Sequence, residues 1–251
     1  MLKYFLVGVV VFIGVAVAFL PATLVPPALD SLPDVSLTAP AGTLWRGTGE
    51  LQVRDQEQVQ QNFGRLTWDF QPLSLFRLTP TYDVTLQDLT MQISYGFSGA
   101  ALKVAGEVPL RLFQPWLDPH QISLGGRLKS QSVDVLLDPQ QPWTTLYIEG
   151  VLDWTGGPVS YFIAQNQTNA ILPPLQVRLR SREDVAGEEG AWRLHGDVMG
   201  DAEYPLLNVA LNESGYVKVS ITKRLTNLVG SPWPGSDPDH VTVLEVEQPL
   251  F

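Results

Sequence analysis

The sequence of 251 residues contains no cysteine and only three histidines. The missing cysteines exclude disulfide bonds, thiolate catalysis and cysteine metal sites. His-Glu-x-x-His, Gly-x-Ser-x-Gly and phosphate-binding glycine motifs are also missing, and the histidines are far apart in the sequence, at His120, His195 and His240. We therefore predict no catalytic, cofactor or metal site, and a protein that is not an enzyme.

Basic residues are scarce: 26 acidic residues face 16 basic ones, and Lys3 is the only charged residue before Asp30. The chain after the first 25 residues thus carries a net charge of −11. Such an acidic surface argues against nucleic acid as a partner and against electrostatic binding to an anionic membrane.

Long hydrophobic runs are also rare, with one exception at the N-terminus. Residues 4–20 form seventeen consecutive apolar residues, and the run extends to Val25 with little interruption. As a helix, about 22 residues rise roughly 33 Å, which spans a bilayer. We predict a transmembrane anchor over residues 1–25, with the chain after it outside the cytoplasm. The alternative is a secretory signal cleaved after Ala18; the apolar run continues past that site, which favours the anchor.

Prolines and period-2 patterns organise the rest of the chain. We predict a stiff, proline-rich tether over residues 26–38 and a β-rich domain over 39–251. Residues 175–180 and 217–222 alternate between apolar and polar side chains, as half-buried strands do. The apolar register changes near Asp88, which predicts a bulge or a tight turn there.

Helical patterns are short and occur only at 72–78, 159–165 and 224–229. Glycines open or break many strand-like runs. The predicted fold is therefore mainly β: one antiparallel, glycine-punctuated meander forming an open or partly closed curved sheet. Gly64–Trp68 also resembles Gly150–Trp154, which suggests two similar halves, although short matches arise by chance.

Seven tryptophans are many for a chain of this size, and we expect most of them in the core or on sheet faces. Trp233 lies among prolines in a predicted loop, where it either folds back over the sheet or contacts a partner. Arg46 is a second candidate contact. Gly42, Trp45, Gly47 and Trp68 form a motif that we interpret as structural, because glycines flanking a bulky aromatic are typical of a tight corner between strands.

Two short segments resemble a known family. The first is Gly-Thr-Leu-Trp-Arg-Gly at residues 42–47, soon after the apolar run and the prolines. The second is Leu-Thr-Trp-Asp-Phe-Gln-Pro-Leu-Ser-Leu at residues 66–75. Together with the overall layout, they resemble the general secretion pathway protein N family, which is distantly similar to AsmA-like proteins.

The resemblance implies a non-enzymatic, single-pass inner-membrane component of the type II secretion apparatus, with residues 4–25 in the membrane and the β domain in the periplasm. Its partners would be other subunits of the apparatus, and no cofactor is implied. The likeness to AsmA-like proteins leaves a second hypothesis open, a membrane-anchored lipid-binding or lipid-transfer β module. A lipid carrier should enclose an apolar cavity, whereas a scaffold should fill that space with side chains.

Overall fold

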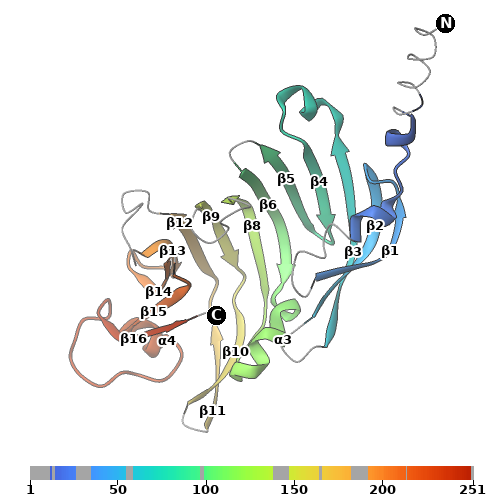
Figure 1. The fold of residues 1–251 in the computed structure, drawn as a ribbon. Helices are drawn as coiled ribbons and strands as arrows, with labels where there is room; N and C mark the ends of the chain where they lie inside the picture. The colour runs from blue at the N-terminus through green and yellow to red at the C-terminus, as the bar shows by residue number, and fades with distance from the viewer. Residues whose placement is uncertain are drawn as a thin grey trace, which may run out of the picture. The chain divides into compact units, whose positions relative to one another are not determined.

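The computed structural model describes residues 12, 15–26, 35–54, 59–96, 99–137, 147–163, 166–181, 192–212 and 214–249, without the side chains of Trp116, His120, Ile163 and Asn166. The chain divides into two compact units, residues 1–90 and 91–251, and each is described by itself (Figure 1).

Unit 1 is an antiparallel sheet in which each strand pairs with the next along the chain. Its elements are η1 (Ala22–Leu24), β1 (Val35–Gly42), β2 (Arg46–Arg54), β3 (Gln60–Gln71), η2 (Pro72–Arg77) and β4 (Thr81–Leu86). Inward-facing apolar side chains alternate with exposed ones along the strands, as the pleat of a sheet requires. The buried set is Leu37, Phe63, Trp68, Phe70, Val84 and Leu86.

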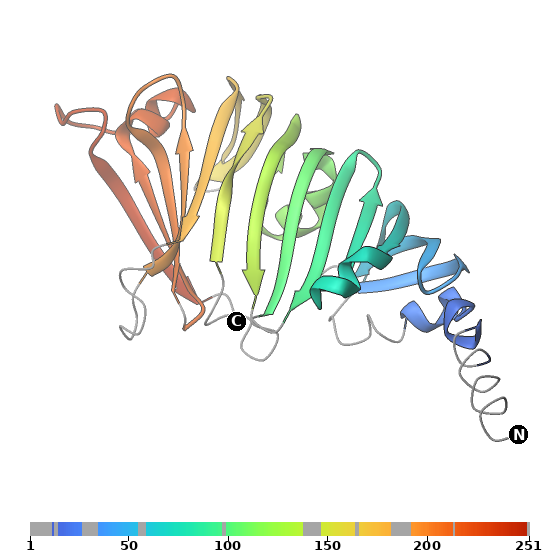
Figure 2. The same cartoon turned by 90° about the horizontal axis from the view of Figure 1, so that it is seen from above.

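Unit 2 continues as an antiparallel meander. Its main sheet consists of β5 (Leu89–Gly96), β6 (Gly99–Pro109), β8 (Arg127–Leu137), β9 (Tyr147–Trp154), β12 (Leu175–Ser181), β13 (Trp192–Met199), β14 (Pro205–Asn212), β15 (Tyr216–Thr222) and β16 (Thr242–Pro249), in that order. Figure 2 shows this order from above, with β16 as the edge strand.

A second, smaller sheet in unit 2 joins β7 (Ser123–Leu124), β10 (Gly157–Ile163) and β11 (Asn166–Leu172). The core of the unit contains Trp154, Val159, Leu172, Leu175 and Leu206. The short helices are η3 (Leu110–Phe113), α3 (Gln114–Leu117), η4 (Asp118–His120) and α4 (Lys223–Leu228).

The mainly β, antiparallel meander is confirmed. Short helices occur at η2 and α4, as predicted, and a tight turn separates β4 from β5, with Gln87 at φ 54°. The helical pattern predicted over 159–165 is wrong, because residues 157–163 form strand β10. Its partner β11 matches it residue for residue, and this pairing outweighs a weak local helical preference.

The N-terminal predictions fall largely on residues that the structure does not describe. Residues 1–11, 13, 14 and 27–34 lie outside the described ranges, so most of the predicted anchor and part of the predicted tether lie there. Residues 15–18 are helical. In the part of the chain that is described, no helix has the length and apolar character needed to cross a membrane. Strand β1 begins at Val35, inside the expected tether.

Candidate functional site

A tight turn between β1 and β2 builds the most distinctive site of unit 1. The Thr43 backbone N–H donates to the Arg46 carbonyl at 2.8 Å, and the Arg46 N–H donates to Thr43 Oγ1 at 3.1 Å. Gly42 has φ 99°, and a Cβ there would lie 2.5 Å from the Arg46 carbonyl oxygen. A Cβ at Gly47 would lie 2.4 Å from the ring of Trp68. Both positions therefore require glycine.

Two tryptophans, Trp68 and Trp45, hold the turn in place through hydrogen bonds and ring contacts. Trp68 is buried, and its indole N–H donates to the carbonyls of Thr43 and Leu44 at 3.1 and 3.2 Å. Trp45 is half-buried, and its ring lies 5.0 Å from that of Phe70, tilted by 51°. The Phe70 N–H also donates to the Trp45 carbonyl at 2.6 Å. The aromatic pair and these backbone bonds fix the orientation of Trp45.

The end of the N-terminal apolar segment is attached to this turn. The Trp45 indole N–H donates to the Val17 carbonyl at 2.8 Å, and the Leu44 N–H donates to the Leu20 carbonyl at 2.8 Å. The Val17 carbonyl also accepts from the Leu20 N–H at 3.3 Å, so Trp45 donates a second hydrogen bond to the same oxygen. Ala22 is 2% exposed. We name this arrangement the Trp45 junction, made of residues 17–22, 43–47, 68 and 70.

Arg46 points away from the junction and pairs with Asp69 on the neighbouring strand. Its Nε donates to Asp69 Oδ2 at 2.9 Å, and its Nη2 contacts the same oxygen. The hydrogen bond to the carboxylate, followed by its charge, raises the pKa of Arg46. The pair is exposed to solvent, so it contributes little to folding. The Asp69 contacts use Nε and Nη2, so the remaining N–H groups of the exposed guanidinium can bind a partner carboxylate.

Trp233 lies in unit 2, in the loop of residues 231–239, and is 41% exposed. The buried Lys223 holds this loop: its ammonium donates to the carbonyls of Gly235 and Asp237 at 2.6 and 2.9 Å. A cation that binds backbone carbonyls limits the motion of the loop and keeps its tryptophan at the surface. Arg46 and Trp233 belong to different units, so they are treated as separate candidate contacts.

The histidines have ordinary surroundings. His195 Nε2 lies 3.0 Å from the Trp192 carbonyl oxygen, and the His240 ring stacks on Tyr204 at 5.0 Å. The side chain of His120 lies outside the described part. Within the described ranges, no group of three or more His, Cys, Asp or Glu side chains could hold a metal ion.

The type II secretion system protein N family matches residues 33–219. The chain belongs to this family. Searches of curated proteins and of solved structures gave no match. Membership makes the chain a component of type II secretion, and it confirms the resemblance carried by residues 42–47 and 66–75.

The part matched to protein N includes the turn and both tryptophans of the Trp45 junction, whereas Val17, Leu20 and Trp233 lie outside it. Sequence reasoning selected Gly42, Trp45, Gly47 and Trp68 together, but it missed Val17 and Leu20. Their contribution is through backbone carbonyls, which every residue carries, so no sequence signal could have identified them.

This member of the protein N family has a second tryptophan corner in unit 2. Trp154 is buried, and its indole N–H donates to the Gly125 carbonyl at 2.9 Å. Gly126 has φ 89°, and a Cβ there would lie 2.7 Å from the Trp154 ring nitrogen. Trp68 and Trp154, which end the two similar sequence segments, thus each bind the carbonyl of a glycine-flanked turn. The two segments share this use of the tryptophan, whereas Gly64 has φ 98° at a bulge and Gly150 lies within β9.

Proposed function

We propose that this protein is a non-enzymatic, single-pass inner-membrane subunit of the type II secretion apparatus. Residues 4–25 anchor it, and its β units stand in the periplasm, where they bind other subunits during the export of folded proteins. The observation that carries the proposal is the Trp45 junction, which fixes the end of the apolar segment to the sheet. A protein that positions a surface near a membrane needs such a fixed connection.

The two candidate contacts suit recognition better than catalysis. Arg46 presents an exposed guanidinium whose ion pair with Asp69 can exchange for a partner carboxylate. Trp233 presents an exposed aromatic on a loop held by Lys223, and tryptophan and arginine are enriched at the centres of protein interfaces.

Site-specific photocrosslinking in native membranes tests the partner. We expect a photoreactive residue at Arg46 or Trp233 to form an adduct with another secretion subunit, whereas one at the exposed Gln167 of β11 should form none. Adducts with unrelated proteins only, at all three positions, would contradict the proposal.

The natural lack of cysteine allows a clean test of topology. A single cysteine at Ser231 should react with a membrane-impermeant maleimide once the outer membrane is opened. Reaction only after the inner membrane is broken would place the β units in the cytoplasm and refute the periplasmic location.

One observation favours a second function, the lipid-binding module. A hollow of about 560 Å³ lies over β10 and β11, with apolar walls that include Leu124, Pro158 and Ile171. Arg111 lines it, and this guanidinium forms no hydrogen bond or ion pair among the described residues. A hollow of this size, with apolar walls and one cation, fits an amphiphile with an anionic head.

Mass spectrometry of lipids that copurify with the protein tests this second function. A bound acidic lipid that is lost in Arg111→Gln would support it. Equal lipid content in the wild type and in Arg111→Gln would contradict a role for this hollow and leave the secretion scaffold as the proposed function.

A further inference from the structure

The turn that joins β3 to β4 in unit 1 exposes a cluster of large apolar side chains. Helix η2 and the residue after it carry four of them within six positions: Leu73 (77% exposed), Leu75 (52%), Phe76 (87%) and Leu78 (65%). Single exposed apolar residues are common, but contiguous groups mark an interaction surface. We name these four residues the η2 apolar cluster.

Hydrogen bonds inside the turn fix its backbone and leave the η2 apolar cluster on the outside. Ser74, the one polar uncharged residue of η2, is buried; its hydroxyl donates to the Gln71 carbonyl at 2.5 Å and accepts from the Thr81 N–H at 3.0 Å. Thr81 Oγ1 in turn donates to the Thr79 carbonyl at 2.8 Å. The turn is therefore built around its polar groups, and its apolar side chains point into solvent.

Leu78 occupies a backbone conformation that favours glycine. Its φ and ψ are 55° and 29°, and its N–H donates to the Leu75 carbonyl while the Thr79 N–H donates to the Ser74 carbonyl. This pattern ends many helices, with glycine at the left-handed position because a Cβ is strained there. A leucine here costs stability and gains little burial, since it is 65% exposed, so its side chain is better explained by a contact outside the chain.

The charge around the cluster indicates what that contact is. Arg77 is the only charged residue from 72 to 80, and it is exposed and forms no ion pair among the described residues. A short element with large apolar side chains and one free cation suits the boundary between lipid headgroups and acyl chains. The apolar side chains drive such insertion, so the acidic charge of the whole chain does not oppose it.

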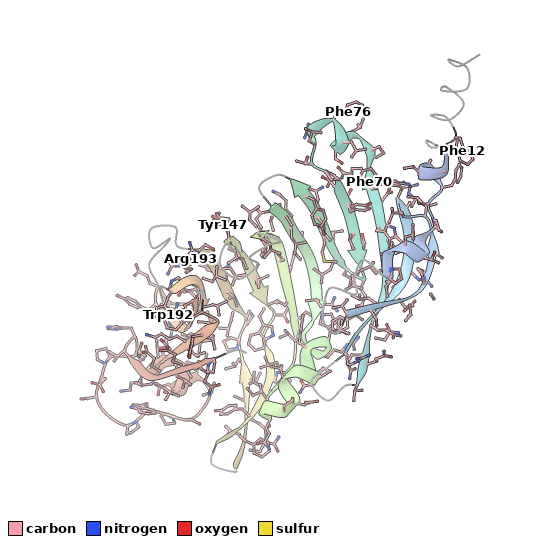
Figure 3. The ribbon with its side chains drawn as sticks, in the orientation of Figure 1. Phe12, Phe70, Phe76, Tyr147, Trp192 and Arg193 are labelled. Atoms are coloured by element: carbon pink, nitrogen blue, oxygen red, sulfur yellow. The ribbon has the colours of Figure 1, made fainter. Side chains whose placement is uncertain are left out.

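The position of the cluster points to the same surface. Figure 3 shows Phe76 and Phe12 at the same end of unit 1, beyond Phe70. Phe12 belongs to the N-terminal apolar segment and is 73% exposed, as are Val15 and Phe19 at 53% and 74%. The cluster thus lies at the same end of unit 1 as Phe12 of the apolar segment.

We propose that the η2 apolar cluster inserts into the headgroup boundary of the membrane that holds the N-terminal segment, with Arg77 against lipid phosphates. Unit 1 then contacts the bilayer at two places, through the N-terminal anchor and through the η2 apolar cluster. This inference rests on the proposed membrane anchoring and adds a second, peripheral contact to it.

Single-cysteine reporters on the full-length chain test the inference. Phe76→Cys, Phe12→Cys and Val59→Cys each receive an environment-sensitive fluorophore and are reconstituted into phosphatidylethanolamine and phosphatidylglycerol vesicles with nitroxide-labelled acyl chains. Val59 is the matched control: it is 50% exposed and precedes β3, whereas η2 follows the other end of that twelve-residue strand, roughly 40 Å away. We expect several-fold stronger quenching at Phe76 and Phe12 than at Val59.

A second variant tests the cause of the quenching. This variant carries the Phe76→Cys reporter together with Leu73→Ser, Leu75→Ser and Leu78→Gly. Quenching at position 76 should fall to the level measured at Val59. The circular dichroism spectrum should stay unchanged, because all three leucine side chains are exposed. Quenching that persists in this variant would overturn the proposed role of the apolar side chains.

The reporters separate failure of the inference from failure of the anchoring. Quenching at Phe12 without quenching at Phe76 would refute the cluster contact and leave the anchor intact. No quenching at either position would refute both. A third outcome would also refute the lipid contact. The fluorophore at position 76 would be unquenched in vesicles, while its emission in native membranes would shift to shorter wavelength. A protein partner would then cover the cluster.

Discussion

The two tryptophans of the junction differ in burial, and this difference determines what each one contributes. Trp68 is 5% exposed, so Trp68→Ala removes a core side chain and should cost about 3–5 kcal/mol. That is a large share of the roughly 5–15 kcal/mol that stabilise a typical domain. Trp45 is half-buried, so Trp45→Ala should cost less. Thermal melts of the two purified variants check the order, and a larger loss for Trp45→Ala would contradict it.

The indole N–H of Trp45 can be tested apart from its ring. Trp45→Phe keeps an aromatic side chain against Phe70 and removes only the bond to the Val17 carbonyl. A single hydrogen bond contributes about 1 kcal/mol, so the melting temperature should fall slightly.

Arg46→Ala, which breaks only an exposed ion pair, should leave the free energy of unfolding within about 0.5 kcal/mol of the wild type. If Arg46→Ala proved the more destabilising change, the ion pair with Asp69 would have a structural role.

A substitution at Leu78 should increase the stability of the folded protein. Leu78→Gly relieves a left-handed leucine and loses little buried surface, so it should stabilise the purified protein by about 1 kcal/mol or less. Denaturant unfolding of the protein in detergent measures this change. A loss of more than 1 kcal/mol would show that the leucine side chain packs within the protein.

Some of the residues chosen from the sequence lie together in the structure. Glycines beside a bulky aromatic indicated a corner, and Gly42, Gly47 and Trp68 do meet in one. The ion pair between Arg46 and Asp69 was not predicted, because it depends on which residues of β2 and β3 face each other. That register is set by a bulge at Gly64, which has φ 98°, and the position of a bulge is not visible in one sequence.

Strands could be predicted where apolar and polar residues alternate regularly. Short segments without a clear period could not be assigned to helix or strand. The alternation over 175–180 and 217–222 correctly indicated β12 and β15. Residues 159–165 carry bulky side chains without a clear period, and the pairing of β10 with β11 decides the structure of residues 159–163. The grouping of the strands into two compact units could not be read from the sequence, since no composition change marks the boundary at 90.

The edge strand β16 provides a pH-dependent test at the scale of one element. Hydrogen bonds from Lys218 and then Ser220 lower the pKa of Glu245 from its usual value of 4.5. A lowered pKa in the folded state means that this carboxylate stabilises β16 above pH 4.5, and the contribution is lost as the pH falls below that value.

Glu245→Gln should therefore lower the urea midpoint slightly at pH 7, and the effect should shrink as the pH falls below 4.5 and the carboxylate becomes protonated, first in the unfolded and then in the folded state. Glu247→Gln is the comparison variant, because Glu247 lies on the same strand opposite Lys218 but forms no ion pair among the described residues. An equal decrease for both variants at pH 7 would show that the contact with Lys218 is not the cause.

At the scale of the whole molecule, the proposed function requires no histidine. Changing His120, His195 and His240 together to Gln should leave secretion of folded proteins intact in cells that depend on this chain. The amount of each variant in the membrane must be measured as well. A large loss of secretion at normal abundance would reopen the hypothesis of acid-base or metal chemistry.

The Trp45 junction also has a mechanical consequence. The bonds from Trp45 and Leu44 reach backbone carbonyls three residues apart, at Val17 and Leu20, so they resist both bending and twisting at the end of the apolar segment. A flexible linker would let the helix and the sheet rotate independently, whereas this connection couples their rotation. Torque applied to the sheet of unit 1 by a neighbouring subunit would turn the helical residues 15–18 with it, and rotation of that helix would turn the sheet.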